Sequence, residues 1–285
     1  MNYRHSFHAG NFADVHKHVT LLAVLDYLLQ KPKPLFYLDT HAGRGLYDLR
    51  HQDAERGSEW QDGIGRIFRP SCHSPLLQRY QQVIHQSQQG AGALYRYPGS
   101  PLLANQVLRE IDRRVFIEKQ VEECVALRKL LRQEHAPNTS IDDSDGYHAL
   151  KAYLPPKEKR GLVLIDPPFE DAHEFQQLEQ ALLFAAERWP TGVYCLWYPL
   201  KAGGLVNTFY ATLKRSALRK LLRAEFWVRP VDTPAGLNGS GMLILNPPWQ
   251  LHDQLATAYA ELTTLLGHNA GSERGGFRVD WLLPE

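Results

Sequence analysis

The chain has 285 residues, of which 44% are apolar and 22% are charged, and its 32 Lys and Arg nearly balance its 31 Asp and Glu, for a formal charge of +1. This composition excludes an intrinsically disordered chain, and the near-zero charge excludes a protein that binds nucleic acid by bulk charge alone. The length suits one large domain, or one domain carrying an insertion, better than several small domains.

The first predicted elements are a helix and a buried strand. Apolar residues recur every three or four positions over residues 13–30, after a candidate N-cap at Asn11 and before Pro32, which predicts an amphipathic helix. Residues 35–38 form a short apolar run that ends at Asp39 and a glycine-containing turn, which is typical of a buried strand.

Three later apolar runs have the same strand character, and helical patterns separate them. The runs span residues 115–117, 162–165 and 193–197, and the clearest helical pattern spans residues 170–189. This alternation predicts an α/β fold with a mainly parallel sheet and helices on both faces.

Two segments depart from the alternation. Residues 46–97 are rich in Gln, Arg and His, hold a predicted helix at 76–89 and have no convincing core strand. They are predicted to form a helical subdomain inserted into a single domain of residues 1–285. Residues 225–229 and 242–245 flank a turn-rich stretch too short for a helix, which predicts an antiparallel hairpin at the sheet edge.

The cysteines and the N-terminal sequence bear on the compartment. Cys72, Cys124 and Cys195 lie far apart and form no CxxC pair, so neither a disulfide framework nor a Cys-based zinc site is indicated. The first residues lack the apolar stretch of a signal peptide, and no run approaches the roughly 18 apolar residues of a membrane span. We therefore expect a cytoplasmic protein that does not associate with membranes.

The turn after the first strand, DTHAGRG, places Asp39 at the strand end, followed by Gly43 and Gly45. In an open α/β sheet this turn borders the crevice that binds ligands, and its glycines let a cofactor approach the backbone. The turn lacks the third glycine of the dinucleotide fingerprint and the GK[ST] of a P-loop, which disfavours NAD and ATP. It resembles the first motif of S-adenosylmethionine (SAM) methyltransferases, although such turns also occur in other α/β proteins. Asp39 and Gly43 are therefore candidate cofactor contacts.

A second motif, Asp166-Pro167-Pro168-Phe169, follows the strand at 162–165 and resembles the [DNS]-P-P-[YFW] motif of methyltransferases that act on exocyclic or amide nitrogens. The N6 amine of adenine is a poor nucleophile because its lone pair is delocalised into the ring. The Asp166 carboxylate and the Pro167 carbonyl can accept hydrogen bonds from the N–H groups of this amine and so favour attack by its lone pair on the methyl group of the cofactor. Phe169 can stack on a base extruded from its helix. Asp166, Pro167 and Phe169 are the candidate catalytic residues; the alternative is a structural turn with Phe169 in the core.

A rival string, Asn246-Pro247-Pro248-Trp249, matches the same pattern. In the seven-stranded methyltransferase sheet the last strand runs antiparallel, so its C-terminal end points away from the cofactor crevice, whereas the fourth strand ends beside it. We therefore assign catalysis to Asp166 and expect Asn246 to start a helix.

Strand order gives further cofactor candidates. Glu118 ends the second strand, where a carboxylate can accept bonds from ribose hydroxyls, and Asp145-Gly146 follows the next candidate strand, where it can hold the adenine of the cofactor. A surface Glu and an ordinary Asp-Gly turn are the alternatives. Ser100 is predicted to N-cap a helix that runs to Glu110 and to face the crevice.

Polar residues crowd the N-terminal segment. Arg4, Lys17 and His18 are candidate contacts of the substrate or the cofactor. A metal site is not indicated, because His16 and His18 lie two apart on a helix, point to different faces, and have no Cys or paired acid to complete a set. The basic stretch 214–223 is predicted to be a helix with a solvated face, with phosphate binding as the alternative.

Longer strings make the resemblance specific. YRHSFHAGN, YLDTHAG, YPGSP, LIDPP, LWYP, SGM followed by NPPW, and a C-terminal W-x-x-PE together resemble the RlmJ family of bacterial 23S ribosomal RNA adenine-N6 methyltransferases, earlier grouped with proteins of DNA utilisation. The resemblance runs nearly end to end. It implies a Rossmann-like fold with a seven-stranded sheet and an inserted helical subdomain, SAM as cofactor, and 23S rRNA, naked or in an early assembly intermediate, as partner.

The resemblance also implies individual site residues. The cofactor contacts would be His18, His41, Ser100, Glu118, Asp145, Gly146 and Asp166. Tyr3 would lie on the substrate side, and Asp166 would be the catalytic acceptor. The chain departs from the family pattern at Phe169, where the relatives have Tyr, and at His16, where an apolar residue is expected.

These residues predict direct, in-line methyl transfer to the amine, without a covalent enzyme intermediate or a metal. A DNA adenine-N6 methyltransferase is one alternative, because the amine chemistry is identical. A non-catalytic nucleic-acid-binding or DNA-utilisation protein is the other. The Arg, His and Gln content of residues 46–97 favours an RNA contact for the insertion.

Overall fold

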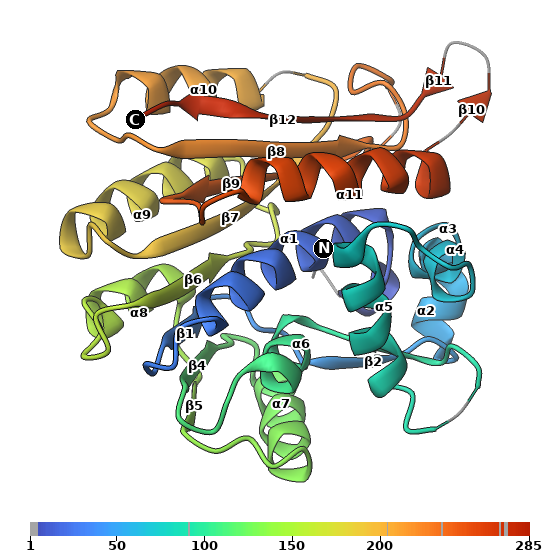
Figure 1. Cartoon of the computed structure of the whole chain (residues 1–285), viewed down its shortest axis with the longest axis horizontal. Coiled ribbons are helices and arrows are strands. Elements are labelled where there is room, and N and C mark those ends of the chain that lie inside the picture. The colour runs from blue at the N-terminus through green and yellow to red at the C-terminus, as the bar shows by residue number, and fades with distance from the viewer. Residues whose placement is uncertain (1–4, 91, 204, 235, 268, 271–272) are drawn as a thin grey trace.

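The computed structural model describes residues 5–90, 92–203, 205–234, 236–267, 269–270 and 273–285. An eight-stranded sheet runs through the molecule, from β12 at one edge to β5 at the other (Figure 1). In order across the sheet its strands are β12 (Gly276–Leu283), β8 (Leu221–Trp227), β9 (Gly239–Leu245), β7 (Val193–Leu200), β6 (Gly161–Ile165), β1 (Phe36–Asp39), β4 (Arg113–Ile117) and β5 (Thr139–Asp142). The strands from β7 to β5 are parallel, whereas β9 is antiparallel to both β7 and β8.

The predicted α/β fold with a mainly parallel sheet is confirmed, but the sheet has eight strands rather than seven. The additional strand is β12, which pairs antiparallel with β8. The predicted hairpin is present as β8 and β9, yet its position at the sheet edge is wrong, because β12 covers β8. The further strand satisfies the backbone N–H and C=O groups that β8 would otherwise expose.

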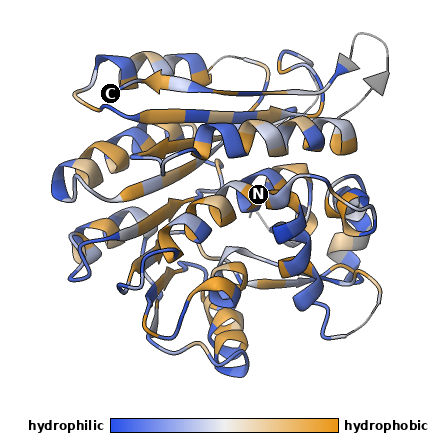
Figure 2. Cartoon of the chain, viewed as in Figure 1, coloured by the Kyte–Doolittle hydropathy of each residue, from blue (hydrophilic) through white to orange (hydrophobic). Residues whose placement is uncertain are grey.

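Helices cover both faces of the sheet. One face carries α1 (Phe12–Leu29), α5 (Pro75–Gln86), α6 (Ser100–Val107), α7 (Val121–Gln133) and α11 (Leu251–Leu266). The other carries α8 (Gly146–Tyr153), α9 (Glu174–Arg188) and α10 (Leu205–Arg215). Successive residues of a strand point to opposite faces, as Tyr37 and Leu38 of β1 do, so the sheet separates two apolar cores. In Figure 2 the central strands are mainly hydrophobic, whereas the helices also carry hydrophilic stretches.

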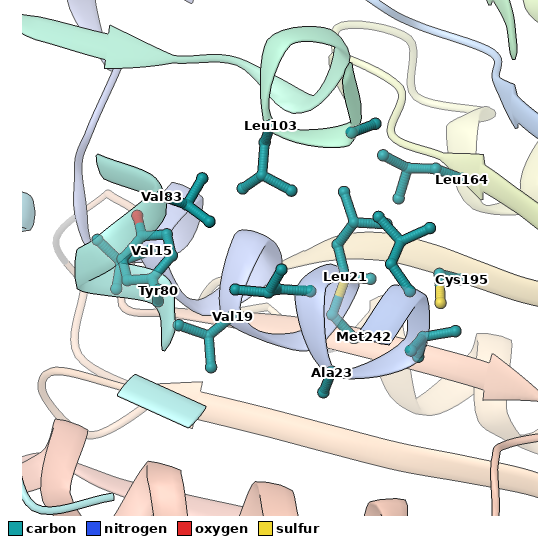
Figure 3. Packing of buried hydrophobic residues seen from close by; sticks show 14 of the residues in the cluster. Val15, Val19, Leu21, Ala23, Tyr80, Val83, Leu103, Leu164, Cys195 and Met242 are labelled. Atoms are coloured by element: carbon teal, nitrogen blue, oxygen red, sulfur yellow. The ribbon is translucent and has the colours of Figure 1, made fainter. Parts of the chain in front are cut away.

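Helix α1 is buried on all sides over its first half and is therefore not amphipathic there. The predicted cap is confirmed, because Asn11 Oδ1 accepts the backbone N–H groups of Ala13 and Asp14. Every residue from Ala13 to Leu25 is buried, since α5, α6 and α11 pack around the helix. Figure 3 shows Val19 of α1 in one apolar cluster with Tyr80 and Val83 of α5 and Leu103 of α6. The polar side chains of this stretch thus lie inside the protein and need polar partners.

The segment predicted as an insertion, residues 46–97, starts at one short strand and ends within another, and the two pair antiparallel. Its elements are β2 (Leu46–Asp48), α2 (Gln52–Gly57), α3 (Glu59–Asp62), α4 (Ile64–Phe68), α5 and β3 (Arg96–Pro98). Its buried side chains belong to the same apolar cluster as those of α1, so the segment packs onto the main core. The remaining short elements are η1 (His5–Phe7), β10 (Asn269–Ala270) and β11 (Glu273–Arg274). Within the described residues, no helix is both long enough and apolar enough to cross a membrane.

Three local predictions are wrong. Gly99, not Ser100, is the N-cap of α6, and the serine is the first residue of that helix. Asn246 does not start a helix, since α11 begins at Leu251 and the Asn246 side chain donates to two backbone carbonyls that precede β7. The basic stretch 214–223 is not one helix either, because α10 ends and β8 begins inside it.

Candidate active site

A cavity of about 790 Å³ lies at the carboxyl ends of the parallel strands, the edge at which open α/β sheets bind ligands. The segments that follow β1, β4, β5 and β6 line it, together with the last residues of β7 and the first turns of α1. These segments are far apart in the chain. They meet because parallel strands all end at the same edge of the sheet.

Most of the predicted site residues meet at this cavity. Those that line it are Lys17, His18, His41, Gly43, Ser100, Glu118, Asp145, Gly146, Asp166, Pro167 and Phe169. Asp39 lies behind the lining and is fully buried. Tyr3 and Arg4 lie outside the described residues. Asn246 of the rival motif follows β9, which is antiparallel to β7, and so lies at the opposite end of the sheet, as predicted.

Lys17 joins two carboxylates in the cavity wall. Its Nζ lies 2.5 Å from Asp166 Oδ2 and 2.9 Å from Asp14 Oδ1, and His5 Nε2 lies 3.0 Å from Asp14 Oδ2. Burial acts to lower the pKa of Lys17, but the two carboxylates outweigh it and raise that pKa well above its usual value. Burial likewise acts to raise the pKa of Asp14, and His5 and Lys17 reverse this and hold that pKa well below its usual value. Lys17 therefore stays charged and anchors Asp166.

Asp39 lies behind the cavity lining and is hydrogen-bonded to residues of that lining. Its Oδ1 accepts the backbone N–H of His41 at 3.3 Å, and the Tyr37 hydroxyl donates to its Oδ2 at 3.3 Å. Burial raises the pKa of Asp39 to about 7, although a hydrogen bond from Ser100 acts in the opposite direction. The Asp39 carboxyl group thus ties the turn after β1 to the first residue of α6.

Glu118 links the turn after β1 to the segment after β4 through two hydrogen bonds from backbone N–H groups. Its Oε2 accepts the backbone N–H of Gly43 at 2.7 Å, and its Oε1 accepts that of Gln120 at 2.7 Å. Gly43 has a φ of +62°, and a Cβ at this position would lie 2.7 Å from the Tyr47 hydroxyl, so the turn requires glycine. Each carboxylate oxygen has two lone pairs, so Glu118 can accept further hydrogen bonds from hydroxyl groups.

The Asp145-Gly146 turn brings two loops together. Asp145 Oδ1 caps α8, because it accepts hydrogen bonds from two backbone N–H groups in the first turn of that helix. This is the structural role expected of an ordinary Asp-Gly turn. Asp145 also lines the cavity. A Cβ on Gly146 would lie 2.1 Å from the Thr40 carbonyl oxygen, so the loops after β1 and β5 approach this closely only with glycine. The His41 ring packs edge-on against Tyr147, and burial lowers the pKa of His41 to about 4, which keeps it neutral at pH 7.

Phe169 belongs to an aromatic wall of the cavity. Its ring centroid lies 4.9 Å from that of Phe175 and 5.6 Å from that of Trp197, both in edge-on contacts. Its backbone has a φ of +53°, a left-handed conformation that is uncommon outside glycine. The ring is partly buried: it packs against the apolar cluster on the sheet face that carries α9 and it also lines the cavity.

Comparison with known proteins identifies the family. A family model described as "Ribosomal RNA large subunit methyltransferase D, RlmJ" matches residues 32–283. The chain belongs to the RlmJ family. Two curated proteins named "Ribosomal RNA large subunit methyltransferase J", from Haemophilus influenzae and Escherichia coli, are each 37% identical to it over 100% of both chains. A crystal structure of a Legionella pneumophila protein is 35% identical with a TM-score of 0.87, covering 96% of this chain and 98% of that one.

The cavity of this RlmJ-family chain is acidic. Its carboxylate residues are Asp14, Glu59, Glu118, Glu123, Asp145, Asp166, Glu170, Asp171 and Glu174. Its lysines are Lys17, Lys119 and Lys201, of which the first is already paired with two carboxylates. This excess of negative charge favours a ligand that carries positive charge. Among the side chains that the structure describes, no group of three or more His, Cys, Asp or Glu could hold a metal ion.

The lining of this RlmJ-family cavity also holds residues that are not among the predicted contacts, such as Asp14 and Trp197. The spacing of Asp14 and Lys17 is a usable signal, because residues three apart on a helix are neighbours. Trp197 belongs to the LWYP string of the family resemblance, but nothing in the sequence assigns it a contact. Its partners lie on other elements, which the sequence alone does not bring together.

Proposed function

We propose that this protein transfers the methyl group of SAM to the N6 amine of one adenine in 23S rRNA, in the cytoplasm, where rRNA is made. The observation that carries the proposal is the position of Asp166-Pro167-Pro168-Phe169. The motif follows β6, the fourth core strand in chain order, and opens on an acidic cavity. The relatives named as large-subunit rRNA methyltransferases support an RNA substrate. We propose that this RNA is naked or in an early assembly intermediate.

The cavity residues fit SAM. When bound, SAM supplies a methyl group on a positively charged sulfur, and the carboxylate excess suits such a cation. The glycines at 43 and 146 keep the backbone open where any Cβ would collide with the protein itself. Glu118 presents a carboxylate beside this turn, as an acceptor for ribose hydroxyls requires. His18, His41, Ser100 and Asp145 complete the proposed contacts.

The motif residues act on the adenine amine. The Asp166 carboxylate and the Pro167 carbonyl accept hydrogen bonds from the N–H groups of the amine. These bonds localise the nitrogen lone pair for attack on the methyl group. Lys17 holds Asp166 in place through Oδ2, and a carboxylate has enough lone pairs to accept an N–H bond as well. Phe169 stacks on the extruded base. All three cysteines are buried, which supports direct transfer without a cysteine intermediate.

The proposal is tested by methyl transfer from tritiated SAM to unmodified 23S rRNA. Asp166→Ala is expected to bind SAM in calorimetry and to transfer no methyl group. Asn246→Ala, in the rival Asn-Pro-Pro-Trp string, is the matched control and is expected to keep transfer. Transfer by Asp166→Ala near the wild-type rate would overturn the catalytic assignment, and preference for duplex DNA over rRNA in competition would overturn the substrate.

A further inference from the structure

Trp197 connects the catalytic motif to the interior of the protein. It lies in β7 and lines the cavity, and its ring meets that of Phe169 at an interplanar angle of 76°. Its Nε1–H donates to Ser240 Oγ at 2.8 Å, so the indole touches the proposed base-stacking residue and is hydrogen-bonded to the neighbouring strand β9.

Ser240 continues this connection to helix α1. Its Oγ lies 2.8 Å from Nδ1 of His16, and both residues are fully buried. Burial lowers the pKa of His16 to about 3, so its ring is neutral at pH 7. A hydroxyl has a single hydrogen, and Ser240 already accepts the indole N–H, so it can donate that hydrogen to Nδ1. The result is a directed chain from Trp197 through Ser240 to His16.

The far end of the chain is held by packing. The His16 ring lies 4.8 Å from the ring of Tyr259 on α11 and stacks at 6.1 Å on Phe226 of β8. A buried ring between two aromatic neighbours has little freedom to turn.

We propose that His16 and Ser240 are positioning residues that hold the Trp197 indole, and through it the Phe169 ring, in the orientation that receives the adenine. The inference rests on the proposed function. Phe169 has a left-handed backbone, a conformation that persists only where its surroundings impose it. Trp197 and Phe175 are the rings in contact with it, and Trp197 is the one with a hydrogen-bonded anchor.

The test compares Ser240→Ala, which removes the acceptor of the indole N–H, with Tyr259→Phe. The control variant removes the hydrogen bond between Tyr259 and Thr20, one helical turn from His16, and keeps the ring that packs on His16. Ser240→Ala loses two buried hydrogen bonds and Tyr259→Phe loses one, so both variants are expected to have a lower Tm than wild type, with the larger fall in Ser240→Ala. Only Ser240→Ala is expected to lose kcat/KM for 23S rRNA, by about fivefold, which corresponds to about 1 kcal/mol. Its Kd for SAM is expected to stay within about twofold of the wild type.

The inference is overturned if kcat/KM of Ser240→Ala equals that of Tyr259→Phe, or if the Kd for SAM rises as much as kcat/KM falls. If Ser240→Ala does not fold, His16→Leu decides the matter by the same two criteria. Trp197→Phe, which keeps a ring but loses the N–H, is expected to behave like Ser240→Ala. Loss of transfer in Asp166→Ala together with normal kinetics in Ser240→Ala would refute the positioning chain and leave the proposed function intact.

Discussion

Replacing Lys17 by methionine removes a buried ammonium group while keeping a long, unbranched side chain. The Lys17, Asp14 and Asp166 side chains are 6%, 3% and 14% exposed, so little water is available to compensate the carboxylates. Removing one partner of a buried ion pair typically costs about 3–5 kcal/mol. With an unfolding entropy of about 2.1 cal/mol/K per residue, a chain of 285 residues is expected to lose roughly 5–8 °C in Tm.

Differential scanning calorimetry at pH 7.5 measures this loss, and Lys119→Met is the matched control. Lys119 lines the same cavity and pairs with Asp145 at 3.3 Å, but its side chain is 74% exposed. An exposed pair contributes about 1 kcal/mol or less, so the control is expected to lose at most about 2 °C. A fall in Tm for Lys17→Met no larger than that of Lys119→Met would refute the reasoning.

The pH dependence gives a second check. The pKa of Asp14 is lower in the folded than in the unfolded state, so its stabilising contribution is present above about pH 4 and lost as pH falls through the folded value. The pKa of Lys17 is higher in the folded state, so its contribution is complete below about pH 10 and lost as pH rises through the folded value. The stability difference between wild type and Lys17→Met is expected to be greatest between these limits. An undiminished difference at about pH 3 would contradict the assignment.

Three further perturbations follow from the cavity. Gly146→Ala drives a Cβ to 2.1 Å from the Thr40 carbonyl oxygen, so calorimetry is expected to show weaker SAM binding and a loss of about 1–3 kcal/mol in stability, whereas Gly92→Ala, in open space, stays near wild type. Phe169→Ala is expected to raise the KM for rRNA by about tenfold, since one base stack contributes about 1–3 kcal/mol, and Phe169→Tyr is expected to stay near wild type in steady-state kinetics. Asp39 has a folded pKa of about 7, above its unfolded value, so its contribution is complete below about pH 4 and lost as pH rises through 7. Asp39→Asn is therefore expected to raise Tm relative to wild type at pH 8 but not at pH 4.

Local patterns in the sequence predicted the parallel core of the sheet, because short apolar runs that end in polar turns are typical of buried strands. The expected direction of the preceding strands also correctly predicted that Asp166 lies at the cavity and that Asn246 lies at the other end of the sheet. The edge of the sheet was harder to predict. The strand β12 is only partly buried and carries charged residues such as Arg278 and Asp280, so it lacks the continuous apolar run of a core strand.

The burial of helix α1 is a second feature that the sequence did not predict. Its apolar spacing predicted a helix, and the bounds are Phe12–Leu29. The spacing also predicted a solvated polar face, which the structure does not have over the first half. Helices α5, α6 and α11 cover that face, and their contacts with α1 are long-range. Helix formation is local, whereas burial depends on what else packs there.

The sequence by itself determined the parallel core strands, the first helix, and the residues at the ends of β1, β4, β5 and β6 that line one cavity. Those features follow from local periodicity and from the rule that parallel strands end at a common edge, whereas the family followed from the resemblance of longer sequence strings. Only the tertiary structure decided that Lys17 joins Asp14 to Asp166 and that His16 reaches Trp197 through Ser240. Such pairs lie up to 224 positions apart, and a buried polar group has no partner until packing supplies one.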